Sequence, residues 1–225
     1  MRLFRCLASP VGVGLAFFAM TAPTVHFSRF SGGFAMVWFA SALLAGRLVV
    51  TAEKNWMPHV VACAIASTLA TGFFGLGWAA AVPMAIVNVA EASAAALVMR
   101  RISIAFWPYD TLEWIAGYYI GIGLVIPLTS GAFATIVATL VRSGDPMVNF
   151  THWIIGHSLG LLACLPIFRF FYWRTSRGRN FLPRPASQES AFFILAVYGL
   201  LCAMVFSMEM RALLVLPLLF IAVGA

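Results

Sequence analysis

The chain has 225 residues, of which 63% are hydrophobic and only 9% are charged. Soluble globular domains carry about 25% charged residues, so this chain has too few charges to cover a surface that faces water. The composition therefore excludes a soluble domain and predicts an all-α, polytopic bundle of about seven or eight transmembrane helices. Because no long polar stretch separates the apolar runs, we expect residues 1–225 to form a single integral membrane domain.

The net charge of +7 does not indicate a nucleic-acid-binding protein, because the arginines lie in short loops between apolar runs. The cysteines have no CxxC spacing and fall in or beside apolar runs, which favours small packing residues over a disulfide framework or a zinc site. These cysteines are Cys6, Cys63, Cys164 and Cys202.

The apolar runs approach the ~20 residues that a helix needs to cross the bilayer. In chain order we expect spans at Leu7–Val25, Gly33–Val50, Met57–Phe74, Trp78–Met99, Thr111–Leu140, Thr151–Trp173, Ser190–Met208 and, short or incomplete, Ala212–Ala225. The first run is expected to be a retained span, because cleavage after Ala22 would place Pro23 just past the cut. The run Thr111–Leu140 is too short for two spans, so it predicts one tilted helix kinked at Pro127. The aromatic stretch Ile102–Tyr109 is expected at the membrane interface.

The loop charges predict a cytoplasmic N-terminus. With that orientation the inner side holds Arg2, Arg5, Arg47, Lys54, Arg100, Arg101, Arg169, Arg174, Arg177, Arg179 and Arg184, and the outer side holds Arg29, Arg142 and Arg211. Eleven cations against three is the bias that the positive-inside rule describes.

Glu91 is an ionisable residue inside the fourth predicted span, where a charge is costly and therefore indicates a role. Asn88 lies three residues earlier on the same helix face. Small residues follow, which allow a neighbouring helix to approach closely. Two readings stay open: a ligand or proton site facing the bundle interior, or a structural polar clamp in which Glu91 is protonated or paired with another helix.

His157 is the second polar group at membrane depth, in the sixth predicted span. Trp153, His157 and Gly160 fall on one helix face, and Gly156 and Gly160 form a small-xxx-small pair that predicts close helix packing. Counting 1.5 Å per residue puts His157 about 8 Å below the outer interface and Glu91 about 10 Å above the inner one. This separation predicts that the two side chains do not touch and form no acid–base pair.

No catalytic or cofactor motif stands out. His152 and His157 are five residues apart and do not converge on one ligand, so we expect neither a metal site nor a haem. The chain has no nucleophile–base–acid set, no HExxH and no P-loop, and its glycine patterns are typical of helix packing. Catalysis within these residues is not expected, and no cofactor is expected.

Several stretches together resemble the bacterial membrane-associated sensor domain family of the first class (MASE-type). They are Trp38–Arg47, similar to the family pattern W-P-x-A-G-x-x-x-x-x-G-R; Asn88–Ala92 before Arg100-Arg101, similar to N-x-x-E-A; Trp153–Gly160 running on to Pro166, similar to W-x-x-G-D-x-x-G-x-x-x-x-x-P; and the apolar tail around Leu216-Pro217. Each motif is weak alone, but the set covers the chain in order and spacing.

The chain departs from the family pattern at two places. Phe39 and Ala42 stand where the second-span pattern has proline and glycine, and His157 stands where the sixth-span pattern has aspartate. Histidine titrates near neutrality, whereas aspartate normally stays charged. If that acid senses a signal in the family, the response to pH is expected to differ here.

The resemblance implies a sensory input domain in the bacterial inner membrane, with Trp38, Asn88, Glu91, Trp153 and His157 as candidate ligand-binding or sensing residues. Such domains precede diguanylate cyclase, phosphodiesterase or histidine kinase outputs, so the chain is expected to be a truncated piece or a stand-alone relative. Expected partners are the lipid bilayer, a cytoplasmic signalling domain or protein, a small-molecule ligand and a second copy in a homodimer. The alternative is a small multi-pass transporter or substrate-capture subunit.

Overall fold

The computed structural model describes residues 8–27, 38–105, 112–142 and 144–176, and every regular element in these ranges is a helix. The chain divides into two compact units, Met1–Trp173 and Arg174–Ala225, and the described residues lie almost entirely in the first. The predicted spans at 190–208 and 212–225 lie outside the described residues, and the single-domain organisation stays a prediction.

Within the described ranges, four helical segments are long and apolar enough to cross a membrane: Met57–Phe74, Trp78–Ser103, Leu112–Val141 and Pro146–Trp173. These correspond to α4 (Met57–Phe74), α5 (Trp78–Ala105), the run from α6 (Leu112–Gly117) to α7 (Ile126–Val141), and α8 (Pro146–Ser176). Two shorter apolar helices precede them, α2 (Pro10–Phe27) and α3 (Ala40–Val49). The described residues thus contain an all-helical membrane domain, while the total of seven or eight spans stays a prediction.

Helix α4 has the bounds that the sequence predicts. It follows a short 3₁₀ turn, η1 (Glu53–Asn55), and carries Pro58 in its first turn, where proline needs no backbone N–H partner. It ends before Gly75, and Gly77 adopts a φ of 90°, which glycine tolerates without steric cost. This turn sends the chain back antiparallel as α5.

Helix α5 extends beyond the predicted end at Met99 and continues through Ala105. Arg100 and Arg101 end the apolar stretch but not the helix, because arginine is a good helix former. Arg100 donates to the carbonyl of Thr51 at 2.9 Å and lies 3.7 Å from Glu53. The first four residues of the predicted interfacial stretch are therefore helical, and residues 106–109 lie outside the described ranges.

The segment from Leu112 to Val141 is one continuous span, as predicted, but its geometry changes before Pro127. Residues Tyr118–Val125 form a π-helix, η2, between α6 and α7. Proline lacks a backbone N–H and its ring collides with the carbonyl four residues earlier, so a regular α-helix cannot run through this point. The wider π-helix on the N-terminal side of Pro127 accommodates that restriction.

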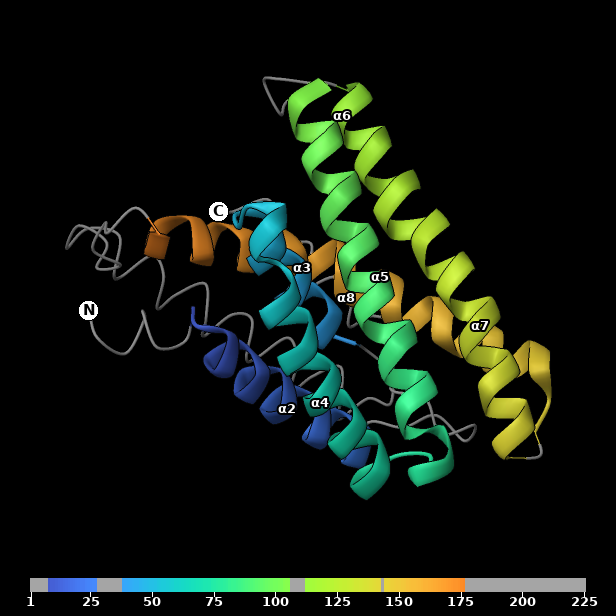
Figure 1. Cartoon of the computed structure of the whole chain (residues 1–225). Coiled ribbons are helices and arrows are strands. Elements are labelled where there is room, and N and C mark those ends of the chain that lie inside the picture. Colours follow the sequence, from blue (N-terminus) through green and yellow to red (C-terminus); the bar gives the residue numbers. More distant parts are fainter. Residues whose placement is uncertain (1–7, 28–37, 106–111, 143, 177–225) are drawn as a thin grey trace, which may run out of the picture. The chain divides into compact units, whose positions relative to one another are not determined.

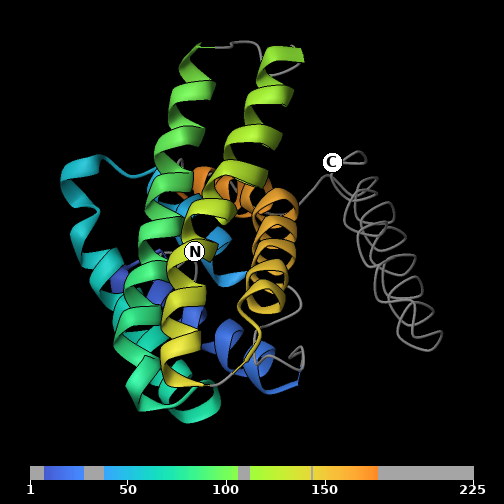
Figure 2. The same ribbon diagram turned by 90° about the vertical axis from the view of Figure 1, so that its right-hand side faces the viewer.

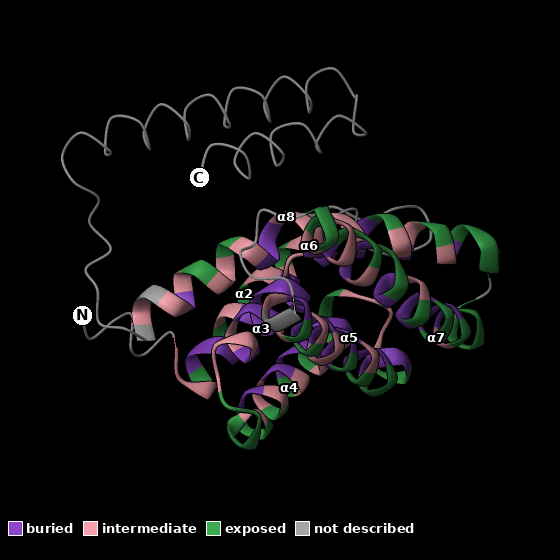
Figure 3. Cartoon of the chain, turned by 90° about the horizontal axis from the view of Figure 1, so that it is seen from above, coloured by how far each residue is buried: buried purple, intermediate pink, exposed green. Residues whose placement is uncertain are grey.

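The helices bury their small residues inward and expose large apolar side chains on the outside. Contacts join α2 to α4, α4 to α5, α3 to α5, and α5 to α7. Helices α5 and α7 run side by side, while α8 crosses behind them and behind α3 (Figures 1 and 2). Exposed residues gather on the outer faces of α4, α5 and α7 (Figure 3), the pattern expected of a bundle surrounded by lipid.

Candidate functional site

Glu91 lies at the middle of α5, thirteen residues after Trp78, and its side chain is fully buried. A buried carboxylate is costly without hydrogen-bond donors. Three donors reach it. Ser130 of α7 donates to Oε1 at 2.7 Å, Ser41 of α3 donates to Oε2 at 2.7 Å, and His157 Nδ1 of α8 lies 2.6 Å from Oε2. One carboxylate therefore joins four helices.

The imidazole of His157 is held between two indole rings. Its ring is stacked on Trp153, with centroids 3.7 Å apart and planes 16° apart, and on Trp38, with centroids 5.4 Å and planes 12° apart. Stacking on both faces fixes the ring plane, so Nδ1 points at Glu91.

The two tryptophans are also tied to the carboxylate through the two serines. Trp38 Nε1 donates to Ser41 Oγ at 3.1 Å, and Trp153 Nε1 donates to Ser130 Oγ at 2.9 Å. Each serine hydroxyl in turn donates a hydrogen bond to Glu91. We call the six side chains the Glu91 network: Trp38, Ser41, Glu91, Ser130, Trp153 and His157. Each is 7% exposed or less, so the network is dry.

The contact between Glu91 and His157 contradicts the prediction that their depths keep them apart. That prediction counted His157 from a span starting near Thr151, but α8 begins at Pro146, which puts His157 about 16 Å along the helix. Glu91 lies about 20 Å from the start of α5. Helix α8 also crosses α5 obliquely (Figure 1), so residue counts along it do not equal depth.

Gly156 and Gly160 lie against the backbone that leads into α3. The Trp38 N–H donates to the carbonyl of Gly156 at 2.9 Å, and a Cβ on Gly160 would overlap the Trp38 carbonyl group. The absence of a side chain at Gly160 lets Trp38 approach α8 closely enough to stack on His157. Trp153, His157 and Gly160 do share one face of α8.

Asn88 is buried but stands apart from the Glu91 network. Its Nδ2 donates to Ser67 Oγ of α4 at 3.0 Å, and its Oδ1 has no hydrogen-bond partner within the described part of the chain. The structure thus brings together four of the five candidate residues, namely Trp38, Glu91, Trp153 and His157, while Asn88 faces a different helix.

Sequence reasoning did not single out Ser41 and Ser130. A serine in an apolar helix usually bonds a carbonyl of its own helix, so a lone serine carries little signal. A weak signal does exist for Ser41, because it follows Trp38 by three residues and so shares its helix face. No such neighbour marks Ser130, which pairs with Trp153 from another helix.

His59 of α4 has different partners from His157. His59 Nε2 accepts from Arg47 Nε at 3.2 Å, and the Arg47 guanidinium lies over the Tyr172 ring at 5.6 Å. Cys63 and Cys164 are buried free thiols, as the packing interpretation predicts, while Cys6 and Cys202 lie outside the described ranges. Within those ranges, no three potential metal ligands cluster together.

Comparison with known proteins identifies the family. The family model named MASE1 matches residues 9–225. The chain belongs to the MASE1 family. It is thus a MASE1 membrane sensor domain, as the sequence motifs indicate. The six residues of the Glu91 network all lie within the matched range.

This MASE1 chain is also similar to a probable diguanylate cyclase, DgcE, of Escherichia coli strain K12. The two are 24% identical over 164 residues, which cover 70% of this chain and 14% of the relative. The chain therefore spans a small part of the length of that relative. No solved structure matches the chain.

Proposed function

We propose that this MASE1 domain detects a signal at the Glu91 network and relays it to a cytoplasmic signalling output. The observation that carries the proposal is the buried contact between Glu91 and His157. With the two serines it links α3, α5, α7 and α8 through one carboxylate. A change in the charge or partners of that carboxylate alters contacts to all four helices together, which is what a relay requires.

The outputs that fit best are those of cyclic-di-GMP turnover. The similarity to a probable diguanylate cyclase supports this choice, with histidine kinases as the other class that the family resemblance implies. We place the domain in the bacterial inner membrane with a cytoplasmic N-terminus. Lys54 and Arg100 lie on the side that this orientation makes cytoplasmic, where Arg100 contacts Glu53.

A fusion tests the proposal. The full chain is joined in frame to a diguanylate cyclase catalytic domain and cyclic-di-GMP is measured in cells. We expect Glu91→Gln and His157→Ala to shift the output relative to the parent fusion. The matched control is Glu113→Gln, because Glu113 is exposed in α6 and lies outside the network. Unchanged output in both network variants would remove the basis of the proposal.

A further inference from the structure

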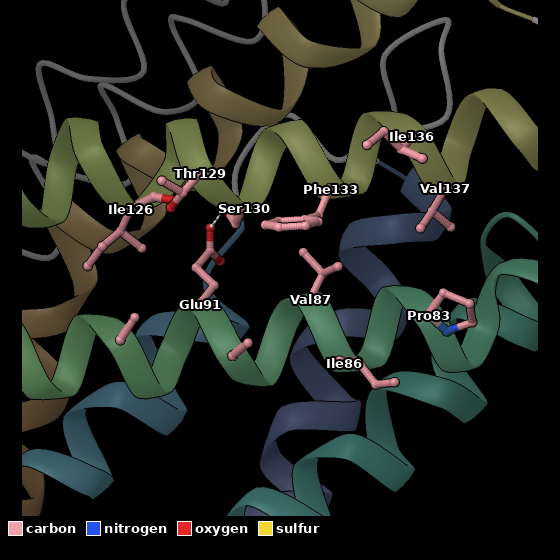
Figure 4. Close-up of a pocket in the computed structure, with 12 residues that line it drawn as sticks. Pro83, Ile86, Val87, Glu91, Ile126, Thr129, Ser130, Phe133, Ile136 and Val137 are labelled. Atoms are coloured by element: carbon pink, nitrogen blue, oxygen red, sulfur yellow. Dashed lines mark hydrogen bonds between the residues drawn. The ribbon is translucent and has the colours of Figure 1, made fainter.

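A groove of about 530 Å³ lies between α5 and α7, and Glu91 and Ser130 of the Glu91 network are among the residues that line it. Its volume falls in the range of small-molecule sites, which are about 300–1,000 Å³ and mostly apolar with a few polar groups. Figure 4 shows Val87 of α5 and Phe133 of α7 facing the space, and Glu91 directed toward Ser130 beside it.

The groove opens to the lipid-facing surface rather than to water. Three of its lining residues are among the exposed apolar side chains of these spans: Ile86 is 61%, Phe133 64% and Ile136 58% exposed. Apolar side chains exposed within a membrane span face hydrocarbon. A ligand would therefore enter from the bilayer.

The hydroxyl hydrogens of the serine and threonine beside Glu91 in the groove already donate to groups of the protein. The Ser130 hydroxyl donates to Glu91 and accepts from Trp153, and the Thr129 hydroxyl donates to the carbonyl of Ile126 at 2.9 Å. What these groups still offer is acceptor capacity, since a hydroxyl oxygen has two acceptor lone pairs and a carboxylate about four. A ligand that complements them must donate a hydrogen bond.

The depth of the site limits the charge of the ligand. Glu91 lies about 20 Å along α5 from its start, well inside the hydrocarbon layer of about 30 Å. A phospholipid head group does not reach this depth, and a charged group there is costly. A neutral donor on an apolar body meets both conditions.

We propose that the α5–α7 groove binds a membrane-soluble alcohol or phenol, with its apolar body between Val87 and Phe133 and its hydroxyl donating to Glu91 or Ser130. The proposal rests on the proposed function in that this molecule would be the signal. Binding can still be measured without any output domain, so the two can fail separately.

The test uses a 4-alkylphenol that carries a photoreactive diazirine in its chain, and the methyl ether of the same probe. Both are added to the full chain in lipid nanodiscs and the labelled peptides are mapped by mass spectrometry. We expect saturable labelling of α5 and α7 that unlabelled 4-nonylphenol competes away. The methyl ether cannot donate, and its labelling should be about tenfold weaker, the loss of one hydrogen bond to a charged acceptor.

A groove-filling variant controls for general partitioning into the bilayer. Ala90 is exposed and lines the groove, so Ala90→Phe should fill it and reduce labelling about tenfold without disturbing the core. Val82 is 56% exposed on the same helix and does not line the groove, so Val82→Phe should label like the parent chain. Circular dichroism confirms that both variants fold.

The proposal is overturned if labelling does not saturate, if the methyl ether labels equally, or if Ala90→Phe labels like Val82→Phe. If labelling fails while the cyclase fusion still responds to Glu91→Gln, the ligand assignment is wrong and the proposed function stands. If labelling succeeds but the network variants leave the cyclic-di-GMP output of the fusion unchanged, the binding site is confirmed and the proposed relay is wrong.

Discussion

The imidazole Nδ1 of His157 lies 2.6 Å from Oε2 of Glu91, although the two residues are 66 positions apart and belong to crossing helices. Both side chains are almost completely buried. Without Glu91, the Nδ1 of His157 loses its partner, and without His157, the Oε2 of Glu91 keeps only the hydrogen bond from Ser41. This mutual dependence makes the pair the centre of the site.

The stability losses from removing Glu91 and from removing His157 should not add. Glu91→Ala leaves His157 and two serine hydroxyls without their acceptor in a dry interior, and breaking a buried pair in this way costs about 3–5 kcal/mol. The double variant Glu91→Ala/His157→Ala should lose less than the sum of the two single variants. Denaturant unfolding in detergent micelles gives the interaction energy, and strict additivity would show that the two side chains are not coupled.

The indole N–H of Trp153 should contribute separately from its stacking. Trp153→Phe keeps an aromatic ring near His157 but removes the donor to Ser130, a loss of about 1 kcal/mol. Trp153→Leu removes both and should destabilise the chain further. Thermal unfolding of the two variants separates the contributions, and equal losses would mean that only one of them matters.

Gly160 should tolerate no side chain, because a Cβ there overlaps the backbone of Trp38. We expect Gly160→Ala to destabilise the chain by about 1–3 kcal/mol, the usual cost of overpacking. Gly123→Ala is the matched comparison, since the atoms that its Cβ meets belong to the movable end of Leu162. A smaller loss at Gly123 supports the close approach, and the reverse order would contradict it.

The Tyr118 hydroxyl connects the π-helix η2 to α8 by hydrogen bonds. It lies 2.8 Å from the carbonyl of Leu162 and 3.1 Å from that of Leu161. Tyr118→Phe should therefore cost about 1 kcal/mol of stability. Tyr119 is 48% exposed, so Tyr119→Phe should leave the midpoint of unfolding unchanged. Similar midpoints for the two variants would show that the hydroxyl bond is not formed in the membrane.

The orientation can be tested by cysteine labelling in intact cells. In a background without the four native cysteines, Lys54→Cys should react with a membrane-impermeant maleimide only after the cells are opened. Asp145→Cys, at the opposite end of the spans, should react from outside. Both positions are exposed. The opposite pattern would reverse the proposed topology.

Helix positions could be predicted from the sequence better than the contacts between helices. The apolar runs predicted both ends of α4 and a single span at Thr111–Leu140, which the structure has at Leu112–Val141, because those features depend on local composition. The contact between Glu91 and His157 depends on where α8 begins and how it crosses α5. Packing between distant segments determines the start of α8 and its crossing angle with α5, and neither can be obtained by counting residues along the chain.

The serine partners illustrate the same limit. Ser41 and Ser130 are ordinary small residues in their own helices, and they become important only because the buried carboxylate lies between them. Polar residues such as Glu91 and His157 could be identified from the cost of placing them in a membrane. The serines that donate to them could not be identified in this way, because placing a serine in a membrane helix has only a small free-energy cost.

Cyclic-di-GMP measured in cells that carry the full chain fused to a cyclase domain tests the central claim most directly. The set comprises the parent, Glu91→Gln, His157→Ala, the double variant and Glu113→Gln. If the network relays the signal, both single variants shift the output, the double variant resembles the singles, and Glu113→Gln matches the parent. Equal output from all five fusions at equal expression would contradict the account.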